Sequence, residues 1–270
     1  MRICSKNYYI SPRIQCKQTP NFSSVMRKYP NLQTYDVDTT RTTSWMFRDL
    51  DWGDFVQLLN ENFKDKDKVN IYSLAASDGS EAYTCAIALK ECLPNKINKK
   101  FFPIIASDID AESINVAKTG RINLSNNDIR AISKFVESKD LLRYLSNSGF
   151  HKYFSDRCPP LEIENNVTYG GVYSYKVSNQ ITQNVHFEQA DMLDQIKKLD
   201  DDSNTVLLCK NVVPYLGKRK LLTLIHLMQE KLKPGSLVVF GEFDFNERML
   251  DTILFTMDFE RISHLIYKKK

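Results

Sequence analysis

The chain has 270 residues, of which 42% are hydrophobic and 26% are charged, and it contains only 9 glycines and 9 prolines. This composition is typical of a globular protein with one large α/β domain or two smaller ones, and it argues against a fibrous, disordered or low-complexity chain. The net charge of +4 is too small, and the basic residues are too mixed with acidic ones, for a nucleic-acid-binding surface.

The sequence carries no membrane or export signal that we recognise. No run approaches the roughly 18 apolar residues of a membrane helix, and residues 1–15 lack the apolar core of a secretory signal. We therefore expect a cytoplasmic protein without a membrane span.

The six cysteines form no CxxC pair and the four histidines lie far apart, so we also expect reduced thiols and no metal site.

The N-terminal part lacks the sustained hydrophobic periodicity of the rest of the chain. Pro12, Pro20 and Pro30 would interrupt a helix in residues 1–42, which predicts an N-terminal arm or short helices there. Residues 43–270 form the main predicted domain. Within it, apolar residues recur at helical spacing from Trp45 to Phe63, which predicts a helix over this stretch.

Strands, turns and helices then alternate along the chain. Each unit places a short β-prone run before a polar turn and a helical stretch. The predicted strands cover residues 69–75, 101–106, 204–209 and 236–243. This alternation predicts an α/β fold with a doubly wound, mostly parallel, Rossmann-like sheet.

A long interruption separates the second and third units. It begins with a helical stretch at 128–145 and continues with β-prone aromatic segments around Gly170 and Gly171. We expect a small antiparallel β insertion at about 150–190. Insertions of this length usually serve recognition, since a plain crossover needs far fewer residues.

In a doubly wound sheet the ligand lies beyond the carboxyl ends of the strands, so the residues after each strand are candidate contacts. After the first strand, the turn from Ala75 to Glu81 contains small residues and one glycine, which let a ligand approach the backbone. Any tight turn favours small residues as well. After the second strand, Asp108 can accept both hydroxyls of a ribose. Its alternative role is a helix N-cap, which Asp110 fits better.

The turn after the third of these strands carries Asn211 and Tyr215. These residues offer an amide and a phenol at the same edge of the sheet. The alternative is an ordinary loop, which Pro214 and Gly217 would equally suit.

The chain contains, in unbroken order, the blocks AASDGSEAYTCAIAL, ASDIDAESINVAKTGRI, YKVSNQITQNVHFEQADML, CKNVVPYL and LKPGSLVVFGE. Together they closely resemble the S-adenosylmethionine-dependent methyltransferases of the chemotaxis receptor family, the CheR type, over residues 40–268. Upstream, TTSWMFRD resembles the family's segment that ends in two aromatics and an arginine. Arg48 stands at the arginine and Met46 replaces one aromatic.

The resemblance implies roles for particular residues. Arg48 and Tyr215 would flank the transferred methyl group as the catalytic pair, and Ser44 lies near a threonine of the family. The backbone at Ala75 would lie close to the cofactor. The acidic and amide residues would contact the cofactor's amino group, ribose, adenine edge and methionine portion, in some division among them. The residues implied to contact S-adenosyl-L-methionine, whose product is S-adenosyl-L-homocysteine, are Ser44, Arg48, Ala75, Glu81, Asp108, Asp191, Met192 and Asn211.

The chain also departs from the family's pattern. Lys210 stands where the family usually has an arginine, Asp191 where it has an asparagine, and Ala82 where it has a proline. The family's helical N-terminal domain corresponds here only to residues 1–42. These departures bear on the substrate more than on the cofactor.

The resemblance implies a protein-glutamate O-methyltransferase that forms a carboxyl methyl ester. Its partner would be a protein substrate, receptor-like or other, docked on the β insertion, which the family uses to contact receptors. Two alternatives stay open. One is an amine or small-molecule methyltransferase, because residues 211–215 faintly resemble the Asn-Pro-Pro-Tyr loop of amino-group methyltransferases. The other is a non-catalytic regulator that binds S-adenosylmethionine.

Overall fold

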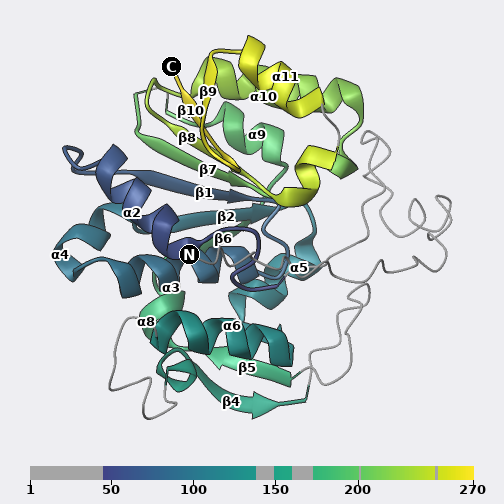
Figure 1. Ribbon diagram of the computed structural model, residues 1–270. Helices are drawn as coiled ribbons and strands as arrows, with labels where there is room; N and C mark the ends of the chain where they lie inside the picture. Colours follow the sequence, from purple (N-terminus) through teal and green to yellow (C-terminus); the bar gives the residue numbers. More distant parts are fainter. Residues whose placement is uncertain (1–44, 138–148, 160–172, 201, 247–248) are drawn as a thin grey trace, which may run out of the picture. The chain divides into compact units, whose positions relative to one another are not determined.

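The computed structural model describes residues 45–137, 149–159, 173–200, 202–246 and 249–270, all within one compact unit, Thr40–Lys270 (Figure 1). The arm predicted for residues 1–42 and the candidate cofactor residue Ser44 lie outside the described residues. Among the described helices, we find none with the length and apolar character that a membrane crossing requires.

The main sheet has seven strands in the order β6-β2-β1-β7-β8-β10-β9. The first five run parallel to one another, and the last two are antiparallel additions. This confirms the predicted doubly wound, mostly parallel α/β sheet. The strands are β1 Asn70–Leu74, β2 Ile104–Asp108, β6 Val185–Gln189, β7 Thr205–Cys209, β8 Leu237–Phe240, β9 Phe259–Ser263 and β10 Ile266–Lys269.

The order of the strands fixes where a ligand can bind. From β1 the chain adds β2 and then β6 on one side, and it later returns to place β7 on the other side of β1. The strand order therefore reverses between β1 and β7. Ligands of open α/β sheets bind beyond the carboxyl ends of the strands at such a switch point.

Helices cover both faces of the sheet, because its central strands are apolar on both sides. In β7, which is buried throughout, Val206 and Leu208 join the hydrophobic cluster beneath α2 and α3, whereas Leu207 and Cys209 join the cluster beneath α9, α10 and α11. The described helices are α2 Trp52–Asn62, α3 Ser80–Cys92, α4 Asn95–Asn98, α5 Ala111–Lys118, α6 Asn126–Glu137, α8 Asn179–Thr182, α9 Met192–Lys197, α10 Lys218–Lys231 and α11 Met249–Thr256. Short 3-10 turns are η2 Lys99–Phe101, η3 Phe150–Lys152, η4 Val213–Tyr215 and η5 Glu242–Asn246.

The small antiparallel sheet is present, but its extent differs from the prediction. It has the order β3-β5-β4, with β3 at Arg121–Leu124, β4 at Phe154–Cys158 and β5 at Tyr173–Val177. Its first strand thus lies upstream of the predicted insertion at 150–190. The last strand of that stretch, β6, instead pairs in parallel with β2 in the main sheet.

The predicted helix from Trp45 to Phe63 is correct only in its second half. Helix α2 begins after Asp51, whose carboxylate caps it by accepting the N–H groups of Gly53 and Asp54. Residues 45–50, which we call the Arg48 segment, contain two left-handed backbone conformations and form no helix.

Candidate active site

The turn after β1 has the backbone of a ligand-binding loop. Ala75 and Ser77 adopt positive φ angles of 55° and 51°, and Gly79 has a φ of 86°. A Cβ at Gly79 would lie 2.8 Å from the ring of Phe187, so only glycine fits there. Positive φ angles at residues other than glycine cost energy and cluster at functional sites.

Asp108 ends β2 and binds this turn directly. Its Oδ2 accepts the Ser77 N–H at 2.8 Å, and its Oδ1 accepts the Asp110 N–H at 2.9 Å. Burial raises the pKa of Asp108, and these backbone hydrogen bonds oppose the rise. The N-cap of α5 is Asp110, which accepts the N–H of Glu112, so the capping alternative for Asp108 is wrong.

Asp191 and Met192 lie beside Asp108. The N–H of Ala190, at the end of β6, donates to the backbone oxygen of Asp108 at 2.9 Å. Asp191 then caps α9 by accepting the Leu193 N–H at 2.7 Å, and Met192 packs against the hydrophobic cluster beneath α9. The structure thus brings these two predicted residues to the same edge as Asp108, with Asp191 already engaged as a cap.

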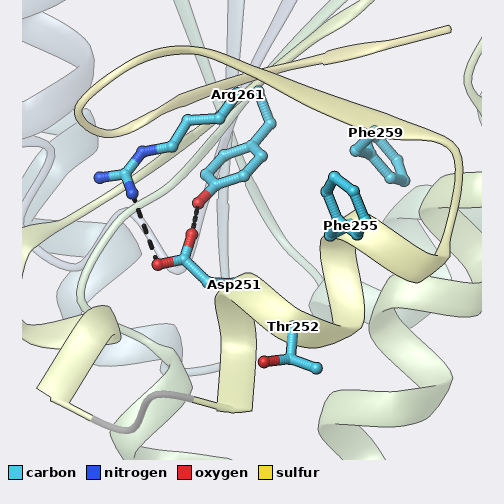
Figure 2. A pocket seen from close by; sticks show the side chains of 6 residues that line it. Asp251, Thr252, Phe255, Phe259 and Arg261 are labelled. Carbon is cyan, nitrogen blue, oxygen red and sulfur yellow. Dashed lines mark hydrogen bonds and ion pairs between the residues drawn. The ribbon is translucent and has the colours of Figure 1, made fainter.

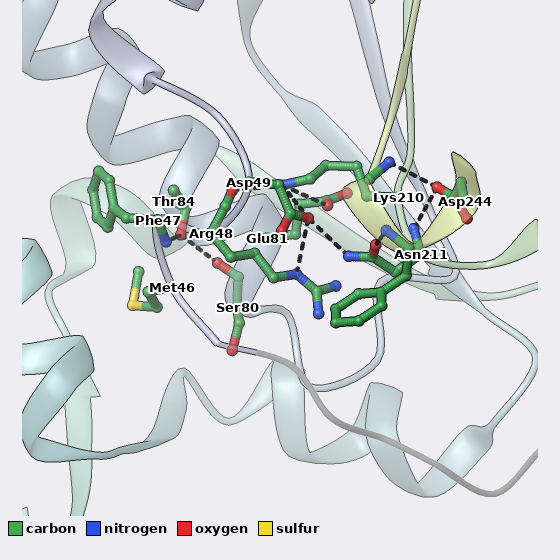
Figure 3. A network of polar contacts seen from close by, with 12 residues as sticks. Met46, Phe47, Arg48, Asp49, Ser80, Glu81, Thr84, Lys210, Asn211 and Asp244 are labelled. Carbon is green, nitrogen blue, oxygen red and sulfur yellow. Dashed lines mark hydrogen bonds and ion pairs between the residues drawn. The ribbon is translucent and has the colours of Figure 1, made fainter. Parts of the chain in front are cut away.

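The Arg48 segment crosses the carboxyl ends of the strands (Figure 3). Its backbone is held by side chains from two helices: the Met46 N–H donates to Asp128 Oδ1 at 3.0 Å, and the Phe47 N–H donates to Thr84 Oγ1 at 3.3 Å. Phe47 and Asp49 have positive φ angles of 56° and 67°. This strained shape, rather than a helix, sets the direction of the Arg48 side chain.

The Arg48 guanidinium lies between an aromatic ring and a carboxylate. Its Cζ is 5.1 Å from the centre of the half-exposed Trp45 ring, and its Nε is 3.9 Å from Asp49 Oδ2. The side chain is only 11% exposed. The sequence alone would equally suit a surface ion pair of Arg48 with Asp49 or Asp51. The structure contains the pair with Asp49, but both side chains are nearly buried at the sheet edge.

Beneath this segment lies a buried ionic cluster. Lys210, only 3% exposed, places its Nζ 3.7 Å from carboxylate oxygens of both Asp49 and Glu81, and it donates to the Arg48 backbone oxygen at 3.0 Å. Glu81 also accepts the hydroxyl hydrogen of Ser73 at 2.9 Å. Burial lowers the pKa of Lys210, and Glu81 and Asp49 oppose the change. Glu81, predicted as a cofactor contact, therefore already holds two interior partners.

Asn211 follows Lys210 in a left-handed conformation with a φ of 58°. Its Nδ2 donates to Asp49 Oδ2 at 2.8 Å, and its Oδ1 accepts the Phe243 N–H at 3.1 Å. Tyr215 ends the next turn, η4, and is partly buried. The structure thus brings Asn211 together with the Arg48 segment as expected for one site, and it shows Asn211 as part of the scaffold there.

Sequence reasoning missed Asp244, the interior role of Lys210, and the contacts of Asp49 with Lys210 and Asn211. Lys210 carried one signal, because it follows a buried strand directly and replaces an arginine of the family. Asp244, and the contacts of Asp49 with Lys210 and Asn211, carried none, since these partners lie far away in the chain.

The described residues also form a surface hollow of about 370 Å³ between α11 and the last two strands (Figure 2). Arg261 lies 3.4 Å from Asp251 and the Tyr267 hydroxyl donates to the same carboxylate, so its polar groups satisfy one another. The hollow is lined by Asp251, Thr252, Phe255, Phe259, Arg261 and Tyr267. None of these follows a parallel strand. In the described part of the chain, no three metal-binding side chains gather.

Residues 42–257 match the family model described as "CheR methyltransferase, SAM binding domain". The match covers most of the chain, which therefore belongs to the CheR methyltransferase family. S-adenosylmethionine (SAM) is accordingly the cofactor of this domain.

Two curated relatives agree with this family. "Chemotaxis protein methyltransferase 2" of Vibrio cholerae is 25% identical over 181 residues, which cover 67% of this chain and 53% of the relative. "Chemotaxis protein methyltransferase" of Salmonella typhimurium is 25% identical over 171 residues, 63% of this chain and 50% of the relative. The chain thus spans about half the length of the curated relatives it matches.

Solved structures give weaker similarities. A TehB-like SAM-dependent methyltransferase from Corynebacterium glutamicum has a TM-score of 0.40 at 9% identity, covering 91% of this chain and 94% of that one. A precorrin-6y C5,15-methyltransferase from Geobacter metallireducens has a TM-score of 0.38 at 9% identity, covering 81% and 78%.

The residues at the strand ends fit this cofactor. The buried hydroxyls of Ser77 and Ser107 have no hydrogen-bond partner within the described ranges, and buried polar groups of this kind are normally satisfied. Each carboxylate oxygen of Asp108 accepts one backbone N–H and keeps capacity for a ligand hydroxyl. The ribose of a nucleoside at this edge would supply hydroxyl partners for Asp108.

Proposed function

We propose that this protein transfers a methyl group from S-adenosylmethionine to the side-chain carboxylate of a glutamate in a protein, releasing S-adenosylhomocysteine. The observation that carries this proposal is the position of Arg48. Burial raises the pKa of Asp78, in the turn after β1, and the positive charge of Arg48 opposes that rise. Arg48 also helps to lower the pKa of Lys210, after β7. The guanidinium is thus within electrostatic range of the turns on both sides of the switch point.

A cation at this place favours a carboxylate acceptor over an amine. A guanidinium presents a planar fork that matches a carboxylate, and it repels the ammonium form in which an amine occurs at neutral pH. The carboxylate is already ionised at that pH, so the transfer needs no general base. The amine alternative lacks such an observation in its favour.

When bound, S-adenosylmethionine supplies an electrophilic methyl group on its sulfonium. The chain's own residues then have to align the reacting atoms for in-line displacement. Arg48 would hold the acceptor carboxylate, Tyr215 would orient the same oxygens or the methyl group, and Asp108 would accept the ribose hydroxyls. One carboxylate oxygen forms the new bond to carbon as the sulfur–carbon bond breaks, and no proton changes place.

The experiment that tests the proposal uses the base lability of the product. The protein is incubated with S-adenosylmethionine labelled in its methyl group and with lysate protein, and the labelled protein fraction is then brought to high pH. We expect release of volatile labelled methanol, because methyl esters hydrolyse in base. Label that stays on protein at high pH would indicate methylated nitrogen and would overturn the carboxylate assignment.

We further infer that the protein substrate docks on the small sheet, along β4. This strand is one of the two outer strands of β3-β5-β4, and residues 155–157 are exposed on it. An edge strand can pair with an extended peptide. Asp156 has a positive φ of 51°, and the pairing register with β5 shifts between Ser155 and Cys158, so we expect docking along the regular part of β4, around Ser155.

A further inference from the structure

The loop after β7 is anchored by one buried carboxylate. Asp244, which is only 1% exposed, lies in η5 just after β8. Its Oδ2 accepts the Asn211 N–H at 2.7 Å, and its Oδ1 accepts the Val213 N–H at 2.9 Å. The same Oδ2 accepts the Gly241 N–H at 2.7 Å. Asp244 thus joins the end of β8 to the loop that leads to Tyr215 (Figure 3).

The loop after β7 also binds the loop after β8 through the side chain of Asn211. The Asn211 side chain accepts the Phe243 N–H at 3.1 Å. Gly241 lies so close to this amide that a Cβ there would be 2.1 Å from Asn211 Oδ1. Because Asn211 also holds a left-handed φ, its conformation depends on these partners.

We propose that Asp244 is a positioning residue for the methyl-transfer site, and that its ionised carboxylate sets the loop from Asn211 to Tyr215 in the conformation that binds cofactor and acceptor. This inference rests on the proposed function for the role of Tyr215. For the role of Asn211 it rests only on the binding of cofactor.

The charge of Asp244 matters because all three of its backbone partners are donors. A neutral acid carries a proton on one oxygen, and that proton would face an N–H group. One of the three hydrogen bonds is then lost, and the loop loses part of its anchor. We call these three hydrogen bonds the clamp. All three are present only when the carboxylate of Asp244 is ionised.

The groups around Asp244 bring its protonation into the pH range of ordinary experiments. Burial raises the pKa of Asp244 to about 6, its three backbone hydrogen bonds oppose the rise, and the negative charge of Asp49 adds to it. The buried thiol of Cys209, at the end of β7, also faces Asp244, and its own pKa is raised, chiefly by burial. Lys210 pairs with Asp49, and Glu242 lies on the same turn as Asp244 but is exposed.

Asp244→Asn reproduces the neutral form, since an asparagine keeps one acceptor oxygen and presents hydrogens where the other oxygen was. Glu242→Gln is the matched control, because it removes one charge from the same turn and leaves the clamp intact. The affinity for S-adenosylhomocysteine is measured by calorimetry from pH 5.0 to 7.5 for both variants and the wild type.

We expect Asp244→Asn to bind roughly 5-fold more weakly than the wild type at pH 7.5, as for one lost hydrogen bond, and the two affinities to converge at pH 5.0. Glu242→Gln should follow the wild type throughout. Asp108 also has a raised pKa, but it is present in both proteins, so the ratio isolates Asp244. A ratio that stays constant with pH, or equals one at pH 7.5, would overturn the proposal.

A second measurement covers the case in which Asp244→Asn fails to fold. Amide hydrogen exchange of the wild type, corrected for intrinsic rates, should show the amides of Asn211 and Val213 losing protection below pH 6 while that of Leu207 in β7 keeps it. Equal behaviour of the loop and the strand would contradict the inference. Neither measurement requires methyl transfer, so a failure of the proposed function is distinguishable from a failure of this one.

Discussion

Arg48 owes its position to its neighbours in space and not to a regular element. Its backbone oxygen accepts a hydrogen bond from Lys210, and its guanidinium lies near Trp45 and Asp49. None of these contacts requires the cofactor. We therefore expect the site to be formed before either substrate binds, which is how an enzyme reduces the cost of aligning its reactants.

Replacing Arg48 tests its assignment to the acceptor. Arg48→Ala should change the affinity for S-adenosylhomocysteine only a few-fold, while kcat falls by on the order of 10²-fold, because the lost interaction serves the aligned carboxylate. Arg48→Lys, which keeps the charge but not the planar fork, should lie between. Equal losses of affinity and rate in Arg48→Ala would place this side chain on the cofactor instead.

Asp108 offers a test of the cofactor contacts. Asp108→Ala should weaken binding of S-adenosylmethionine and S-adenosylhomocysteine by about 1–3 kcal/mol, the usual cost of losing a charge-assisted hydrogen bond. The loss includes the contact with Ser77, which Asp108 holds directly. Calorimetry of Asp110→Ala provides the control, since this residue caps α5 and its loss should lower stability more than affinity. Unchanged affinity in Asp108→Ala would remove Asp108 from the binding site.

Asp244 also links stability to pH. Its folded pKa of about 6 lies above the ordinary value of 3.8, so the fold disfavours the ionised form. Its contribution to stability is full below the unfolded pKa and is lost as pH rises through 6, by up to about 3 kcal/mol. In urea unfolding, the stability of the wild type relative to Asp244→Asn should thus fall between pH 4 and pH 7. A constant difference would show that Asp244 does not titrate in this range.

At the scale of elements, the parallel strands and their turns could be predicted because their signals are local. Short apolar runs ended by polar turns mark β1, β2, β7 and β8. The choice between Asp108 and Asp110 as N-cap followed from their positions relative to α5, and the hydrogen bond from Glu112 confirms it.

The Arg48 segment could not be predicted in this way. Its apolar residues suggested a helix, but Met46 is instead buried in the hydrophobic core, and its backbone N–H donates to the side chain of Asp128 in α6. Lys210 and Asn211 lie 162 residues away from their partners Arg48 and Asp49. Contacts between residues so far apart in the chain produce no periodic pattern in the sequence. The small sheet was misjudged in extent for the same reason, since its partner strand β3 precedes the inserted stretch.

The small sheet yields a test of docking. Deleting residues 166–180 would remove β5, the middle strand of the sheet, and so would disrupt the whole of it. Ser155→Lys on the outer strand β4 is milder, because a lysine on an edge discourages strand pairing. We expect it to raise KM for a protein substrate several-fold while kcat and the affinity for S-adenosylhomocysteine stay unchanged.

The matched control for docking is Ser263→Lys, an exposed serine on β9, the edge strand of the main sheet. It should leave KM unchanged. If Ser155→Lys and Ser263→Lys give the same KM as the wild type, the β4 edge does not dock the substrate.

At the scale of the whole molecule, the candidate site residues gather at one edge of the main sheet, beyond the carboxyl ends of its parallel strands. The turns after β1, β2 and β7 converge there with the Arg48 segment, and the family identifies S-adenosylmethionine as the cofactor. The most direct test is calorimetric titration of the folded wild-type protein with S-adenosylhomocysteine. We predict one site per chain with micromolar affinity, and competition by S-adenosylmethionine. A folded protein that gives no heat with either ligand would contradict the site described here.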